Sequence, residues 1–283
     1  MLEEIVDPSY AREKPSLIFF LAILFVSLAV LINIALPNLA GAALTFAFAP
    51  AIPLILSLLI KEEDEEEKRL ELLEQKRAWQ YHLPLLKVFS LFFAGAFVAY
   101  MLWYAFLPDS IGTTVFGSQQ QEISRLGVEF VKTTRSEVVS ERGQNYVRIY
   151  EVSGRVIKPG LAWKLFAHNA VVLLFMFFFS FIYGVGAIYL LLWNASVIGI
   201  FVGEQFRQFG FNEFLSVFLR ILPHGLLEVG AYFMAAIAGG VLSVALMHKH
   251  HMKPQFKLIA IDIGLLLFNS IAALALAAVL ESI

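Results

Sequence analysis

The sequence predicts an all-α fold, a polytopic bundle of transmembrane helices with a small extracytoplasmic loop region. Of its residues, 59% are hydrophobic, against about 45 to 50% in an average soluble domain. Much of this apolar content falls in runs of about 20 residues, the length at which a helix crosses the hydrocarbon layer of a bilayer. We therefore expect a multi-pass protein of the cell membrane, surrounded by the lipid bilayer.

Charge and cysteine content exclude several classes of function. The net charge is −2, so no basic surface for a nucleic-acid partner is expected. The absence of cysteine excludes thiol catalysis and thiolate metal sites. Glycine-rich phosphate loops are also missing, and no cofactor is expected.

Residues 1–60 predict an N-terminal transmembrane hairpin. Its first crossing is Leu17 to Leu36, which Pro37 ends, and its second is Ala40 to Ile60. Residues 61–84 predict a charged cytoplasmic helix with acidic and basic side chains four apart, either a solvated extension of the second crossing or a docking surface. Residues 85–107 form the third predicted transmembrane helix.

Residues 108–167 are polar and predict an extracytoplasmic loop or small cap, in which Gln144 to Val156 alternates as a strand or short hairpin does. Residues 168–283 form the predicted C-terminal membrane core. Its apolar run from His168 to Gly203 is too long for one upright helix and short for two. We expect a crossing to about Trp193, followed by a short or re-entrant segment.

Glu204 to Pro223 mixes charged residues with phenylalanine, as interfacial helices do. The central helix, Pro223 to Met247, follows, and the last crossing is Leu258 to Leu280. Basic residues cluster around the second and third crossings, which places the N-terminus in the cytoplasm. Six or seven passages are possible, and seven, with the C-terminus outside, is favoured.

Polar side chains within the apolar segments predict an intramembrane network, because ionisable groups in a membrane helix usually face other protein. His224 and Glu228 lie four apart at the start of the central helix and are expected to bond each other and the region around Asn194. The full predicted network is Asn169, Asn194, His224, Glu228, Asp262 and Asn269. Small residues that allow close helix packing are Gly199, Gly203, Ala235 and Gly239.

A metal site is a competing interpretation of the same residues. Imidazole and carboxylate four apart on a helix can face one ion, and Asp262 would be the natural third ligand to His224 and Glu228. The HExxH motif of zinc hydrolases is missing, so a purely structural hydrogen-bonded network is favoured and no metal is expected.

Three stretches together resemble the stage II sporulation protein M family of integral membrane proteins. They are HNAVVLLFMFFFSFIYGVGAIYLLLWNASVIG, then PHGLLEVGAYFMAAIAGG, then the final apolar helix. The opening DPSYAREKPSLIFFLAILF, with the acidic run after the second helix, resembles the N-terminal extension of archaeal members. The resemblance implies membrane anchoring and assembly with protein partners.

The expected function is therefore a non-catalytic multi-pass protein that anchors or scaffolds a membrane complex. Its protein partner would bind the charged cytoplasmic helix or the external loop, and a homo-oligomer is possible. Two alternatives stay open: a transporter or permease subunit working with a separate ATPase, and an intramembrane metal-dependent hydrolase.

Overall fold

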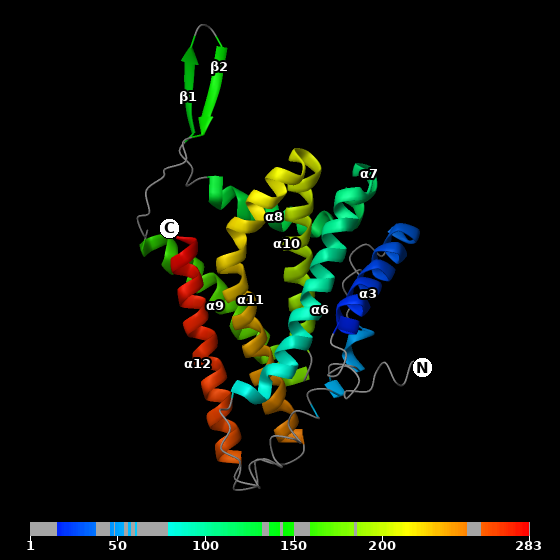
Figure 1. The fold of residues 1–283 in the computed structure, drawn as a ribbon, viewed down its shortest axis with the longest axis vertical. Coiled ribbons are helices and arrows are strands. Elements are labelled where there is room, and N and C mark those ends of the chain that lie inside the picture. The colour runs from blue at the N-terminus through cyan, green and yellow to red at the C-terminus, as the bar shows by residue number, and fades with distance from the viewer. Residues whose placement is uncertain are drawn as a thin grey trace.

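The computed structural model describes residues 16–37, 46–47, 49–53, 56–57, 60, 79–131, 136–141, 144–149, 159–183, 186–247 and 256–282. Its helices and strands are, in chain order, α3 (Ser16–Ala35), α6 (Trp79–Phe106), α7 (Asp109–Val115), α8 (Gly117–Val131), β1 (Ser136–Glu141), β2 (Gln144–Ile149), α9 (Pro159–Tyr183), α10 (Ala187–Phe209), α11 (Phe211–Met247) and α12 (Phe256–Glu281). Figure 1 shows the long helices side by side as a bundle.

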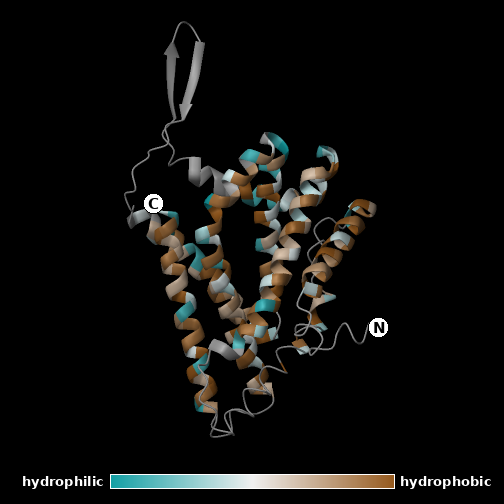
Figure 2. Ribbon diagram, viewed as in Figure 1, coloured by the Kyte–Doolittle hydropathy of each residue, from teal (hydrophilic) through white to brown (hydrophobic). Residues whose placement is uncertain are grey.

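Six of the described helices are long and apolar enough to cross a membrane: α3, α6, α9, α10, α11 and α12. In Figure 2 hydrophobic residues cover most of their length. The predicted class, a polytopic helical membrane bundle, is confirmed. The charged segment expected at 61–84 lies almost wholly outside the described residues.

Helices α3 and α6 run parallel to each other. Gly95 of α6 touches the backbone of Phe19 near the start of α3. Further along both helices, the Trp103 indole N–H donates a hydrogen bond to Ser27 Oγ over 3.0 Å. The end of α3 and the start of α6 therefore lie at opposite ends of this helix pair, and the chain between them connects the two. The predicted second crossing, Ala40 to Ile60, falls in this stretch, of which only a few residues are described.

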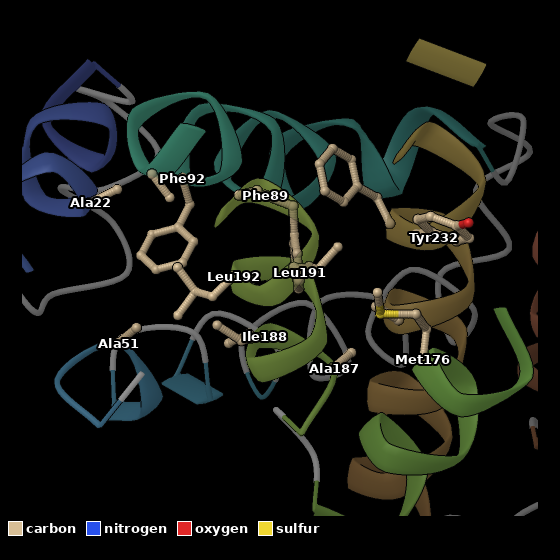
Figure 3. Close-up of a cluster of buried hydrophobic side chains, with 14 of the residues drawn as sticks. Ala22, Ala51, Phe89, Phe92, Met176, Ala187, Ile188, Leu191, Leu192 and Tyr232 are labelled. Carbon is tan, nitrogen blue, oxygen red and sulfur yellow. The ribbon is translucent and has the colours of Figure 1, made fainter. Parts of the chain in front are cut away.

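The core lies where α6, α10 and α11 meet. Phe89 and Phe92 of α6 pack beside Ile188 and Leu191 of α10, and all four are buried (Figure 3). Buried Ala51, from the stretch between α3 and α6, lies in the same cluster. This burial identifies α6 and α10 as inner helices, whereas a smaller share of the residues of α9 and α12 is buried.

The expected crossing to about Trp193, followed by a short or re-entrant segment, is wrong. The chain instead forms two helices, α9 and α10, which are separated near Gly186. Two helices fit because α9 begins at Pro159, ahead of the apolar run, and because α10 continues to Phe209, past its end. The polar residues at both ends of the run hid this extra length.

The separate interfacial helix expected at Glu204 to Pro223 is also absent. Gly210, with a φ of 81°, divides this segment into the end of α10 and the start of α11. Such a left-handed backbone favours glycine. Helix α11 then runs on through Pro223 for 37 residues, or about 55 Å. Pro223 therefore lies inside a helix, although the sequence suggested that it opens one.

The region between α6 and α9 contains two short helices, α7 and α8, and an antiparallel β-hairpin. Strand β1 pairs with β2, with Val138 opposite Val147. Of the strand or short hairpin predicted over Gln144 to Val156, Gln144–Ile149 forms a strand, and residues 150–156 lie outside the described part of the chain. Figure 1 shows the hairpin projecting beyond the bundle, at the end where α12 finishes, whereas α3 begins toward the other end. We call these the hairpin end and the opposite end.

Candidate functional site

The candidate site is a polar cluster near the hairpin end, between α9, α11 and α12. The side-chain amide of Asn169 donates a hydrogen bond of 2.6 Å to Glu228 Oε1. Asn169 comes from α9 and Glu228 from α11, and both are partly buried. This bond ties two transmembrane helices together at one end of their contact.

Two further residues surround Glu228. The carboxylate of Glu281, at the end of α12, lies close enough to interact electrostatically with it. Tyr232, one helical turn below Glu228 on α11, is 4% exposed and interacts with both carboxylates. Sequence reasoning missed Glu281 and Tyr232. Glu281 could have been found as the only acidic residue at the end of the last crossing.

His224 and Asn194 do not join this cluster in the expected way. His224 is partly buried one turn from Glu228, and no hydrogen bond links the two within the described part of the chain. Asn194 donates to the Leu190 carbonyl of its own helix over 2.9 Å. The expected bond between His224 and Glu228 is therefore replaced by the bond from Asn169.

Asp262 and Asn269 lie elsewhere on α12. Glu281 is beside Glu228 at one end of that helix, and Asp262 is about 28 Å away near its start. Asp262 therefore cannot share an ion with His224 and Glu228. Over the described ranges, no group of three or more His, Cys, Asp or Glu side chains could hold a metal. Asn269 is exposed on the outside of the bundle.

The predicted small residues lie at helix contacts inside the molecule. A Cβ added to Gly199 would lie 2.8 Å from the Phe97 carbonyl oxygen, and one added to Gly203 would lie 2.7 Å from that of Met101. This pair therefore joins α10 to α6 within one chain. Ala235 is fully buried in α11, and Gly239 of the same helix touches the backbone of α9 at Phe177.

A second set of polar contacts fastens α7 and α8 to the hairpin end. Gln119 of α8 donates to Ser196 Oγ of α10 over 3.3 Å, and Gln120 donates to Tyr104 Oη of α6 over 2.8 Å. Phe116, between α7 and α8, is buried against the ring of Tyr104. Glutamines in a polar loop gave no signal of these contacts in the sequence.

The cluster draws its polar side chains from three helices. Asn169 of α9 donates a hydrogen bond to Glu228 of α11. Glu281, at the end of α12, interacts electrostatically with Glu228. Among the residues that the structure describes, no serine is hydrogen-bonded to a basic side chain that a third group orients, as nucleophilic catalysis would require.

A family model described as stage II sporulation protein M matches residues 86–283, from α6 to the C-terminus. The matched residues include the polar cluster around Glu228 and the contacts of Gln119 and Gln120, and they leave out α3. No curated protein and no solved structure matches the chain.

Proposed function

The chain belongs to the stage II sporulation protein M family, and we propose that it is a non-catalytic multi-pass membrane protein that anchors or scaffolds a membrane complex. The observation that supports this role best is backbone contact between helices at glycines. Gly95 joins α3 to α6, Gly203 joins α6 to α10, and Gly239 joins α9 to α11. Helices in such contact form a firm platform, because sliding them would bring side chains into the backbone.

The partner binds the β-hairpin in this proposal. The described sheet has two strands only, so each strand leaves one backbone edge without a neighbouring strand. A lone hairpin of this kind is at best marginally stable in water. An extended segment of a partner protein would satisfy the open edge by strand addition.

The basic residues that flank the second and third predicted crossings favour a cytoplasmic N-terminus. The hairpin end then faces the outside, and the partner's binding segment is extracytoplasmic. The predicted charged helix at 61–84 would offer a second contact surface on the cytoplasmic side.

Purification from native membranes tests this role. A variant in which residues 136–149 are replaced by a glycine and serine linker of equal length lacks the hairpin and keeps the transmembrane helices. The same replacement at residues 248–255, between α11 and α12, is the matched control. We expect a stoichiometric partner with the wild type and the control and none with the hairpin variant. Equal recovery from all three, or no stoichiometric partner from any, would contradict the proposal.

A transporter or permease subunit that works with a separate ATPase is the second candidate. Glu228 favours it, since a carboxylate within a membrane-spanning helix often marks an ion or substrate path. Flux through reconstituted vesicles that disappears on Glu228→Gln would support this function and argue against the anchor. A metal-dependent hydrolase has no comparable support, because Asp262 lies far from Glu228.

A further inference from the structure

The outer face of α12 is apolar and open. Leu265, Phe268, Ile271 and Leu276 are 48, 68, 50 and 52% exposed, and Figure 2 shows hydrophobic residues along most of this helix. In a bilayer such side chains meet lipid or another transmembrane helix.

Asn269 lies on this open face. Its neighbour Ser270 is fully buried and donates a hydrogen bond of 2.8 Å to the Leu266 carbonyl. The exposed side-chain amide of Asn269 has no such partner anywhere in the described ranges. Helix α12 thus directs a satisfied polar group inward and an unsatisfied one outward.

The depth of Asn269 makes this exposure costly. Lys257 and Glu281 mark the two ends of α12, and Asn269 lies about 18 Å from each along the helix axis. A hydrocarbon layer of about 30 Å centred on α12 places Asn269 near its middle. Acyl chains there neither donate nor accept hydrogen bonds, whereas an amide needs both partners.

We propose that α12 is the interface of a homodimer, centred on a pair of Asn269 side chains. A second copy inserted in the same direction carries its own Asn269 at the same depth. Around a two-fold axis, each amide N–H can donate to the other copy's side-chain carbonyl. Lipid offers no such group, and an unrelated partner helix would need a polar residue at this one depth.

The neighbouring residues suit such a pairing of helices. Leu265, Asn269, Ala272 and Leu276 follow one another at spacings of four, three and four, and all are exposed. This spacing forms a coiled-coil seam, in which one polar residue fixes register and the number of strands. The dimer goes beyond the proposed anchoring role, because it uses no residue of the hairpin.

Cysteine cross-linking tests the dimer, since the natural chain contains no cysteine. Leu265→Cys and Leu276→Cys each place one thiol on the seam and keep Asn269. The matched control is Phe178→Cys on α9, which is 49% exposed and outside the seam. A disulfide needs Cα atoms within about 7 Å. After oxidation in native membranes, we expect a dimer band from both seam variants and little from the control.

The role of the amide is tested in the same cysteine background. Asn269→Leu should weaken dimerisation about tenfold, the effect of losing interhelical hydrogen bonds in a membrane. Asn269→Gln, which keeps an amide, should retain most of the cross-link. Thermal stability of the monomer should be unchanged, because the side chain makes no hydrogen bond in the described part of its own chain.

Three outcomes would overturn the dimer: no cross-link from either seam cysteine, an equal cross-link from Phe178→Cys, or an undiminished one after Asn269→Leu. A cross-link that stays intact, together with no stoichiometric partner from any variant or equal recovery from all three, would refute the anchoring role alone. The two proposals therefore fail separately.

Discussion

Replacing Gly239 by alanine should loosen the contact between α9 and α11. An added Cβ would lie 3.0 Å from both the Phe181 amide nitrogen and the Ser180 Cβ, and closer still to the Phe177 carbonyl oxygen. Carbon atoms in contact prefer about 3.5 to 4.0 Å. Much of the obstacle is backbone, so α9 itself must move.

Overpacking of this kind costs about 1 to 3 kcal/mol. A value of about 2 kcal/mol corresponds to a roughly 30-fold change in the unfolding equilibrium. Gly230→Ala is the matched control, because Gly230 lies in the same helix and an added Cβ there meets nothing within 4 Å. We expect the control to match the wild type or to exceed its stability by up to about 1 kcal/mol, because alanine has a higher helix propensity than glycine.

The assay is reversible unfolding in mixed micelles with increasing SDS, followed by the fluorescence of the four tryptophans. Gly239→Ala should unfold at a lower SDS fraction than Gly230→Ala. If the two variants unfold at the same SDS fraction, α9 moves aside at no cost in stability. Backbone contact at Gly239 would then not hold the bundle rigid. The main support for a fixed platform would then be lost.

Three further changes test other contacts by the same unfolding assay. Glu228→Gln keeps an acceptor for Asn169 and should be more stable than Glu228→Leu by about 1 to 3 kcal/mol, since leucine leaves the amide unsatisfied; equal stability would mean that this bond does not hold the helices. Ser27→Ala removes the acceptor of the Trp103 indole N–H and should lower the free energy of unfolding by about 0.6 kcal/mol. An unchanged free energy of unfolding would show that this bond does not help to hold α3 against α6. Asp109→Asn breaks an ion pair with Arg207 in which the aspartate is 88% exposed, and should change stability by less than about 1 kcal/mol; a larger loss would show that this contact fastens α7 to α10.

The polar cluster shows what a sequence pattern can and cannot reveal. The spacing of His224 and Glu228 pointed to the right helix, although the two residues lie inside α11 and not at its start. The hydrogen bond expected between them is absent, because the helix that packs beside Glu228 determines which side chain can reach it. Asn169 fills that place from α9, and Glu281 approaches from a helix that begins 28 residues further along the chain. One-dimensional periodicity carries no information on such neighbours.

Length and hydropathy alone determined that this chain is a multi-pass helical membrane protein, because a bilayer requires apolar helices about 20 residues long. The spacing of small residues along the helices also predicted which glycines permit close packing. Only the tertiary structure decided that Gly199 and Gly203 face α6 within the chain, and that Asn269 faces outward. The physical reason is that lipid and protein interior are equally apolar, so hydropathy does not tell an inner helix face from an outer one.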